Sequence, residues 1–408
     1  MAAPKLRFKE FDGDLTESKL VELTLWASGG TPAKDIPEYW GDDIPLISGA
    51  SMHTNQLYES DVKITRLGLQ KGSKLAPKDS ILILVRGSML FNKIPMGITL
   101  GDVAFNQDVK CIRPKQELAP QFLFQWLHAK ENTIQNKVTA TGIGAGKLDT
   151  ADLQNLKLYK PSSEEQTKIA SFLSNVDEKI SQLTQKHELL SQYKQGMMQK
   201  LFSQQVRFKA DDGSEFGEWE SISIKSAVSF IKDGTHGTHQ DDPTSHLFLL
   251  SAKNLQNGHV VIDEKDRRIN KLEFDSIYKN YGLNTGDILL SVVGTIGRVA
   301  IFKEEYKNYA FQRSVAFMRF KSAKPEFIFQ LFNAVDFQNE LLVRQVVSAQ
   351  PGIYLGDLSK IQIKLPCQEE QTKIANFLSA IDQKIEVVAQ QIEQAKQWKK
   401  GLLQQMFV

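Results

Sequence analysis

The sequence contains very little cysteine. Cys111 and Cys367 are the two cysteines among 408 residues, and neither belongs to a Cys-x-x-Cys pair. A framework of disulfides is therefore not expected, and this usage fits a reducing compartment.

Long hydrophobic runs are also missing. The longest, Ile81 to Val85, is far shorter than the roughly 20 residues that a membrane-spanning helix needs. The segment from Met1 to Phe11 alternates charged and apolar residues and lacks the apolar centre of a signal peptide. We therefore expect a soluble, cytoplasmic protein with no membrane contact.

An excess of one charge is absent as well. The chain carries 50 Lys and Arg against 48 Asp and Glu, a net charge of +2. This balance excludes the overall basicity of a histone-like protein, so any surface for nucleic acid must be a local patch. Hydrophobic residues make up 41% of the chain, which is enough for folded cores.

No familiar catalytic motif is present. The segment Gly142–Lys147 resembles a P-loop, but its glycine spacing is one residue short and no Ser or Thr follows the lysine. His236, His239 and His246 have no cysteine or carboxylate set at metal-ligand spacing, and Asp-x-Lys triplets such as Asp108–Lys110 arise often by chance. We expect no catalysis and no metal site, with a metal-dependent nuclease centred on His236 and His239 as an alternative.

An internal repeat organises the sequence. Glu164–Ile180 and Glu369–Ile385 are identical at 13 of 17 positions, at an offset of 205 residues. Such self-similarity sets the architecture. Weaker matches recur upstream at nearly the same offset: Arg7-Phe8-Lys9 with Arg207-Phe208-Lys209, Ala104–Gln107 with Ala310–Arg313, and Pro120-Gln121-Phe122 with Pro325-Glu326-Phe327.

Each copy of the repeat opens a long helix with a 4-3 pattern of apolar residues. That pattern is typical of a coiled-coil seam, and we expect the two helices to pack antiparallel. Pro161, followed by Ser163 and Gln166, resembles a helix start with a capping box. The predicted seam consists of Ile169, Leu173, Val176, Ile180, Leu183, Leu190, Ile374, Leu378, Ile381, Ile385, Val388 and Ile392.

An alternative is that each helix lies across the core of its own globular unit. This arrangement would leave the length of the helix unexplained, since residues 164–202 would span about 58 Å at 1.5 Å per residue.

The rest of each half predicts a globular α+β unit. Ile81–Val85 and Asp287–Val293 indicate buried strands, and Phe122–Lys130 and Glu326–Asn333 indicate amphipathic helices. No βαβα rhythm is present, so a doubly wound sheet is not favoured. We predict two globular units at 1–160 and 206–365, and two helices at 161–205 and 366–408.

Polar loops recur at equivalent points in the two globular units. Ser28–Trp40 and Lys232–His239 combine glycines, hydroxyls and basic or aromatic side chains, and Asn106-Gln107 answers Gln312-Arg313. Asn, Gln and Arg pair with adenine and guanine edges. Each loop alone is also an ordinary polar turn, but the recurrence favours a function. The candidate DNA-binding residues are Thr31, Lys34, Tyr39, Arg86, Ser88, Asn106, Gln107, Lys147, Lys232, Thr235, His236, His239, Thr295, Arg298, Gln312, Arg313 and Gln350.

These motifs resemble one known family. The segments Gly29–Met52, Ile231–His239 and the paired Pro161–Ala170 and Pro366–Ala375 look like the specificity subunit of type I restriction–modification systems. The resemblance covers essentially the whole chain. The second half carries Asp233-Gly234-Thr235-His236 instead of Gly-Gly-Thr-Pro, and this difference suggests that the two halves read different half-sites.

The resemblance implies a concrete function. Each globular unit would be a target recognition domain reading a few base pairs of double-stranded DNA, and the helices would space the half-sites and dock two methylase subunits. S-adenosylmethionine would be held by the methylase subunits, and ATP and Mg²⁺ by separate motor-nuclease subunits. A coiled-coil scaffold without DNA contact remains a second alternative.

Overall fold

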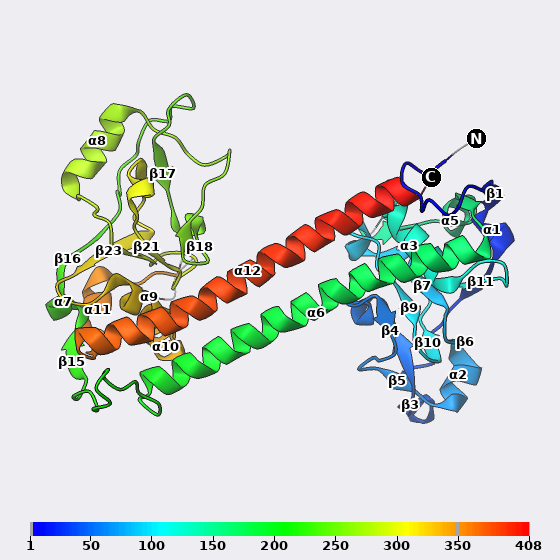
Figure 1. Cartoon of the computed structure of the whole chain (residues 1–408), viewed down its shortest axis with the longest axis horizontal. Helices are drawn as coiled ribbons and strands as arrows, with labels where there is room; N and C mark the ends of the chain where they lie inside the picture. The colour runs from blue at the N-terminus through cyan, green and yellow to red at the C-terminus, as the bar shows by residue number, and fades with distance from the viewer. Residues whose placement is uncertain (1–2, 143, 347–350, 408) are drawn as a thin grey trace. The chain divides into compact units, whose positions relative to one another are not determined.

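The computed structural model describes residues 3–142, 144–346 and 351–407. The chain forms two compact units. Unit 1 comprises Met1–Thr184 with Gln390–Val408, and unit 2 comprises Gln185–Ala389. Each unit therefore holds one globular part, which we name head 1 (residues 1–160) and head 2 (residues 206–365), together with about half of each long helix (Figure 1).

Head 1 is built on a sheet with the strand order β2-β11-β7-β9-β4. The central strand β7 is buried at all four positions, as its unbroken apolar sequence requires. Helix α3 covers this sheet and buries its residues from Phe122 to Leu127. The bounds are β2 Thr24–Ser28, β11 Val109–Pro114, β7 Ile81–Leu84, β9 Met96–Thr99, β4 Gln56–Leu57 and α3 Pro120–Ala129.

A second sheet of head 1, with the order β5-β3-β10-β6, lies beside helix α2. Figure 1 shows these elements, in blue and cyan, at the end of unit 1 that lies away from the long helix α6. The bounds are β5 Lys63–Ile64, β3 Trp40–Ile47, β10 Val103–Phe105, β6 Lys74–Ala76 and α2 Arg66–Gly72. The remaining elements of head 1 are β1 Thr16–Lys19, α1 Leu20–Leu23, β8 Arg86–Gly87, α4 Glu131–Gln135, β12 Thr139–Ala140, β13 Gly146–Lys147, α5 Thr150–Gln154 and β14 Lys157–Lys160, with short 3-10 turns at Pro37–Tyr39 (η1), Gly49–Ser51 (η2) and Ser88–Phe91 (η3).

Head 2 repeats this plan with the sheet order β16-β23-β20-β21. Strands β17 and β22 pair in parallel, as β3 and β10 do in head 1. The bounds are β15 Glu220–Ser223, α7 Ile224–Ala227, β16 Val228–Asp233, β17 Phe248–Leu250, β18 Leu255–Gln256, β19 His259–Val260, α8 Lys271–Asn280, β20 Ile288–Ser291, β21 Val299–Ile301, β22 Tyr309–Phe311, β23 Val315–Phe320, α9 Pro325–Asn333, α10 Val335–Val343, α11 Leu355–Lys360 and β24 Gln362–Leu365, with 3-10 turns at Ala252–Asn254 (η4) and Glu304–Tyr306 (η5).

The strands and helices that the apolar patterns predicted are present. Ile81–Val85 contains β7, and Asp287–Val293 contains β20. The two amphipathic helices are α3 and α9. The predicted α+β fold with two long helices is therefore confirmed.

The two long helices are continuous. Helix α6 runs over Ser163–Phe202 and α12 over Gln368–Met406. Within unit 1 the start of α6 packs antiparallel on the end of α12, since Ile169 and Met406 share one core while Lys399 Nζ lies 2.6 Å from Asp177 Oδ1. Within unit 2 the same contact recurs between Lys194 Nζ and Asp382 Oδ1 at 2.6 Å.

Residues of the predicted seam at the start of each helix pack both on a head and on the other helix. In unit 1, Ile169, Leu173 and Val176 join the core of head 1 together with Leu402 and Met406 of α12. In unit 2, Ile374, Leu378 and Ile381 join the core of head 2 with Met198 and Leu201 of α6. The first turns of each helix therefore lie on their own head, as the alternative held, and also contact the other helix.

The start of α6 differs from the predicted capping box. The cap is Ser162, whose Oγ accepts a hydrogen bond from the backbone N–H of Glu165 at 3.3 Å. Gln166 does not reach back to the cap. Instead its Oε1 accepts from the N–H of Ala119 at 2.9 Å, and so ties the start of α3 to α6.

The Arg-Phe-Lys repeats attach each head to its own long helix. Arg7 forms a two-pronged ion pair with the buried Glu165, with both nitrogen–oxygen distances at 2.7 Å. Arg207 pairs with Glu370 in the same way at 3.0 and 2.8 Å. Buried pairs of this geometry tolerate little change, which accounts for the similarity of the two copies.

Candidate nucleic-acid interface

A glycine fixes the loop that follows the first strand of each head. A Cβ atom on Gly29 would lie 2.1 Å from the carbonyl oxygen of Phe105, so another residue cannot take this place without moving the backbone. A Cβ atom on Gly234 would meet the carbonyl oxygen of Phe311, also at 2.1 Å. The two glycines therefore hold equivalent positions.

Backbone hydrogen bonds extend this equivalence along the loop. The N–H of Gly30 donates to Phe105 O at 3.0 Å, and the N–H of Thr235 donates to Phe311 O at 2.9 Å. Gly30 thus corresponds to Thr235, and the next residue in head 1, Thr31, corresponds to His236.

The loops after β10 and β22 correspond in the same manner. The N–H of Asn106 donates to Ile47 O at 2.9 Å, and the N–H of Gln312 donates to Leu250 O at 2.8 Å. The next residues are Gln107 in head 1 and Arg313 in head 2, and both side chains are exposed. The backbone is therefore shared, while the side chains that it presents differ.

In head 1 several candidate residues meet in one open pocket of about 570 Å³. Thr31 Oγ1 donates to Gln107 Oε1 at 2.8 Å, and Trp40 Nε1 donates to Ala33 O at 3.0 Å, so both sides of the pocket are held in place. Tyr39 lies next to the pocket in η1 but does not line it. The lining residues are Thr31, Lys34, Trp40, Leu46, Ser48, Val62, Asn106 and Gln107.

The other candidates of head 1 lie on a separate strand pair. Arg86 on β8 and Lys147 on β13 are direct cross-strand partners, and Ser88 follows in η3. Lys110 on β11 donates to Ser28 Oγ at the end of β2. Burial lowers the pKa of the Lys110 ammonium, and the positive charges of Arg86 and Lys74 lower it further.

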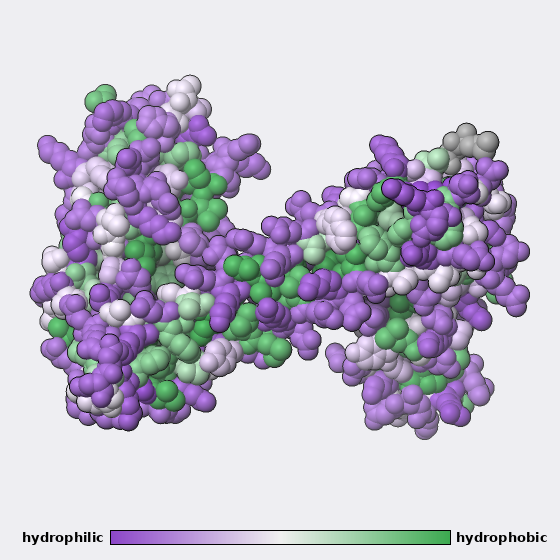
Figure 2. Space-filling view, viewed as in Figure 1, coloured by the Kyte–Doolittle hydropathy of each residue, from purple (hydrophilic) through white to green (hydrophobic). Residues whose placement is uncertain are grey.

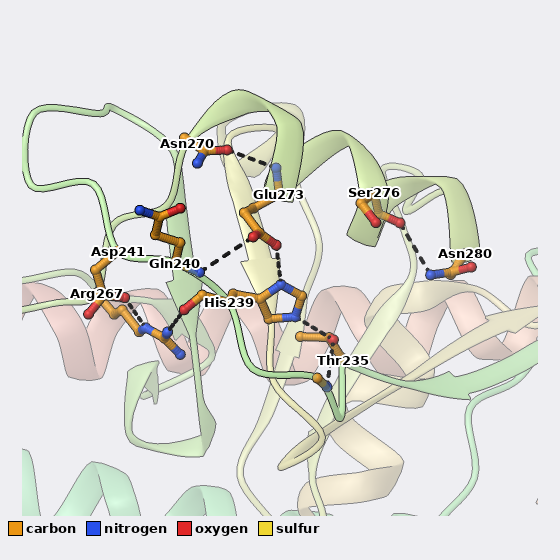
Figure 3. A network of polar contacts seen from close by, with 10 residues as sticks. Thr235, His239, Gln240, Asp241, Arg267, Asn270, Glu273, Ser276 and Asn280 are labelled. Atoms are coloured by element: carbon orange, nitrogen blue, oxygen red, sulfur yellow. Dashed lines mark hydrogen bonds and ion pairs between the residues drawn. The ribbon is translucent and has the colours of Figure 1, made fainter.

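In head 2 a polar network holds the loop after β16 (Figure 3). His239 contacts Thr235 Oγ1 through Nε2 at 2.7 Å and Glu273 Oε2 through Nδ1 at 2.6 Å. The hydrogen bond with His239 lowers the pKa of the Glu273 carboxyl. Arg267 joins the network through the carbonyl of His239 and the carboxylate of Asp241. His239 thus connects Thr235 to Glu273 in the first turn of α8.

Other candidates of head 2 are bound to the protein itself. Lys232 Nζ donates to the carbonyl of Asn280 at 2.6 Å. Arg298 Nη1 lies within 3.2–3.4 Å of three backbone carbonyls of the η4 region. Thr295 is exposed in the loop after β20, and Gln350 lies outside the described residues.

The histidines of the nuclease alternative are also engaged in protein contacts. His236 Nε2 lies 2.8 Å from Asp233 Oδ2, and both ring nitrogens of His239 have partners. Within the described ranges, no three His, Cys, Asp or Glu side chains are grouped so that they could hold a metal ion. In the same part of the chain no helix is long and apolar enough to cross a bilayer.

Sequence reasoning missed four polar residues of these sites. Lys110 and Lys74 belong to the basic cluster of head 1, and Arg267 and Glu273 support the loop of head 2. Lys110 is half-buried in a strand, and an Asp-x-Lys triplet such as Asp108–Lys110 is too common by chance to mark a site. Arg267 and Glu273 lie about 30 residues beyond the loop that they hold, and no local pattern marks them.

Comparison with known proteins identifies the family. The family model described as the type I restriction modification DNA specificity domain matches residues 13–192 and again residues 222–397. The two matches cover most of the chain and correspond to the two halves of the internal repeat.

Individual relatives agree with the family model. The type I restriction enzyme MjaVIII specificity subunit of Methanocaldococcus jannaschii is 30% identical over 414 residues, which cover 97% of this chain and 94% of that protein. The EcoR124I/EcoR124II specificity subunit of Escherichia coli is 29% identical over 182 residues, 44% of this chain and 45% of that protein.

A solved structure shows the same fold. The crystal structure of a type I restriction-modification S subunit from M. genitalium superposes with a TM-score of 0.60 at 15% sequence identity, covering 100% of this chain and 99% of that one.

The family also settles the question of catalysis. Specificity subunits are non-catalytic and carry no cofactor, and S-adenosylmethionine and ATP belong to the partner subunits of the complex. The nuclease and scaffold alternatives are therefore wrong. The chain belongs to the DNA specificity subunits of type I restriction–modification systems.

Proposed function

We propose that each head reads one half of a split DNA site and that the two halves differ in sequence. The observation that carries this proposal is the shared backbone with exchanged side chains. Thr31 is replaced by His236, and Gln107 is replaced by Arg313, at positions that the same backbone hydrogen bonds define.

The exchanged side chains favour different bases. Amides such as those of Asn106 and Gln107 pair best with adenine, whereas an arginine such as Arg313 pairs best with guanine. The candidate DNA-binding residues of head 1 and head 2 named above are proposed to line the DNA surface, and those in the pocket of head 1 and in the loop that His239 holds in head 2 are proposed to contact bases.

Selection from a random library of DNA duplexes tests the proposal. The full chain, assembled with methylase subunits, is expected to enrich a motif of two unlike halves separated by a fixed gap. An ungapped motif, or two identical halves, would contradict it.

The helix pair is proposed to dock two methylase subunits, and motor-nuclease subunits are proposed to join them. Apolar side chains remain exposed on the helices of unit 2: Leu189 at 58%, Tyr193 at 52% and Val387 at 52%. Figure 2 shows hydrophobic atoms along the long helices, among hydrophilic stretches. Exposed apolar side chains of this kind favour a protein partner.

The helices are further proposed to set the gap between the half-sites. This role assumes the predicted domain division, with the heads at 1–160 and 206–365 and the helices at 161–205 and 366–408. Because α6 and α12 are continuous over 40 and 39 residues, each is long enough to extend past one DNA turn of about 34–36 Å.

An insertion tests this spacing role. Four residues added after Leu183 in α6, with four more added near Ile392 in α12, preserve the pairing that the Asp177–Lys399 contact sets. They lengthen the helices by about 6 Å. The selected motif is expected to keep both halves and to change its gap by one or two base pairs, and altered halves would refute the spacing role.

A further inference from the structure

Head 1 carries two basic side chains opposite each other on a strand pair. Arg86 and Lys147 are direct Cα partners across β8 and β13, so their side chains leave the same face of the pair. Arg86 is exposed, and the Lys147 side chain is 41% exposed. Like charges at directly opposed positions destabilise a strand pair, and an anion bound between them removes that cost.

Lys110 lies close to Arg86 of this pair, and Lys74 lies close to Lys110. Lys110, on β11, is near enough to Arg86 and to Lys74 of β6 for both charges to act on its ammonium group. One carboxylate is also near, since Asp149 Oδ1 lies 2.8 Å from Lys147 Nζ. Both members of that ion pair are largely exposed, at 41% and 59%, so it contributes little and an anion can displace it.

Head 2 has an equivalent backbone pairing, as an isolated bridge, without the charges. The N–H of Val85 donates to Asp108 O at 2.8 Å, and the N–H of Val292 donates to Ser314 O at 2.9 Å. The residue after Val85 is Arg86, and its counterpart after Val292 is therefore Val293.

The other two counterparts follow from strand pairing. Val293 pairs with Gly352 as Arg86 pairs with Lys147. Ala316 pairs with Asp233 at the place where Lys110 pairs with Ser28. Three cations of head 1 are thus replaced in head 2 by valine, glycine and alanine.

We propose that head 1 binds a phosphate of the DNA backbone between Arg86 and Lys147, and that head 2 lacks this site. The inference rests on the proposed reading of DNA by both heads. A guanidinium and an ammonium on opposite sides suit a phosphodiester, because the first gives a planar fork and the second a point charge. Lys110, which lies near Arg86, adds to the positive potential there.

The consequence is an unequal dependence of the two heads on salt. Each phosphate that a cation neutralises releases counterions, and this lowers the slope of log affinity against log salt concentration by about 0.9. Head 1 therefore anchors the chain through the DNA backbone irrespective of sequence, whereas head 2 relies more on its contacts with bases.

Two matched double variants of the full chain test the site. Arg86→Ala with Lys147→Ala removes the pair from head 1. Val293→Arg with Gly352→Lys places an equivalent pair in head 2, where a Cβ atom on Gly352 would meet its nearest neighbours at an ordinary 3.6 Å. Binding of each chain to a labelled duplex of random sequence is measured by fluorescence anisotropy over a range of salt concentrations.

The loss variant is expected to reduce the magnitude of the salt slope by about 1, because one phosphate contact is removed, and the gain variant to increase it by a similar amount. Unchanged thermal melting of both variants shows that folding is intact. A loss variant with the slope of the wild type, or a gain variant without an increase, would overturn the inference. If the wild-type complex still selects a gapped motif in that case, the proposed function stands and this site alone fails.

Discussion

Thr31 in head 1 and His236 in head 2 leave the same backbone position, yet one presents a hydroxyl and the other an imidazole. The position is shared because Gly29 and Gly234 lie against equivalent carbonyl groups, those of Phe105 and Phe311. Under the proposed function, a shared backbone with replaceable side chains would let one head change its base preference without a cost to its own core.

A single substitution in one head should therefore change one half of the motif. Gln107→Ala removes an amide from the pocket of head 1, and we expect it to relax base preference at one or two positions of one half-site. A good bidentate contact contributes about 1–3 kcal/mol of discrimination, or roughly a factor of 5 to 150. Arg313→Ala is the matched control and should relax the other half.

Selection from the same random duplex library reads both variants. If Gln107→Ala and Arg313→Ala relax the same half, or if neither changes the motif, these side chains do not read bases. An unchanged melting temperature is expected for both, because each side chain is exposed.

Only part of this residue-level detail could be predicted from the sequence. Thr31, Lys34, Asn106 and Gln107 follow strand ends that lie close together in the fold, so loop composition was enough to select them. Composition could not show that Arg298 is bound to backbone carbonyls, because a side chain's partner depends on the tertiary fold.

The long helices are similar in the two halves because each one holds a head. Glu165 binds Arg7, and Gln166 binds the first turn of α3, so two adjacent residues tie α6 to two separate parts of head 1. Glu370 and Gln371 do the same in unit 2. The apolar 4-3 pattern predicted the helices. A strand of two residues, such as β8, is too short to show a periodic pattern of apolar residues and could not be predicted.

The starts of the two helices differ in one respect that can be tested. Ser162 caps α6 with its hydroxyl, and the corresponding residue before α12 is Cys367, which is exposed. Cys367→Ser should supply the missing cap and stabilise the protein by about 1 kcal/mol, and Ser162→Ala should destabilise it by a similar amount. Urea denaturation of the full chain measures both, and equal stability of all three proteins would show that the caps do not matter.

In unit 1 a largely buried polar contact joins the two helices to head 1. Asp177 accepts from Lys399 Nζ at 2.6 Å and from Gln125 Nε2 at 2.7 Å, and Lys399 is only 9% exposed. Because the partners are largely removed from water, loss of one leaves the other poorly satisfied.

A double-mutant cycle measures this contact. Asp177→Asn and Lys399→Met should each destabilise unit 1 by about 1–3 kcal/mol, with a coupling of about 1–2 kcal/mol between them. The equivalent cycle at Asp382 and Lys194 should give a smaller coupling, because Asp382 is 37% exposed and water screens its charge. Additive effects in unit 1 would show that the pair does not set the helix register.

For the whole molecule, the duplication supplies two copies of one frame, and divergence of the heads gives each copy its own surface. The family model matches both halves, so both retain the fold of a DNA specificity domain. Yet Arg86, Lys147 and Lys110 of head 1 correspond to Val293, Gly352 and Ala316 in head 2, so the two surfaces differ in charge at these positions. The fold class and the repeat could be predicted from periodicity and self-similarity, but the unequal surfaces required the tertiary structure, because strand pairing decides which residues correspond.

Two unlike heads are proposed to read a split site. Sequencing of modified bases across the genome of a cell that carries this chain and its methylase partner tests the claim most directly. We predict one motif with two different halves and a constant gap, and we expect both halves to be lost when the gene for this chain is deleted. A continuous motif, or two identical halves, would contradict it.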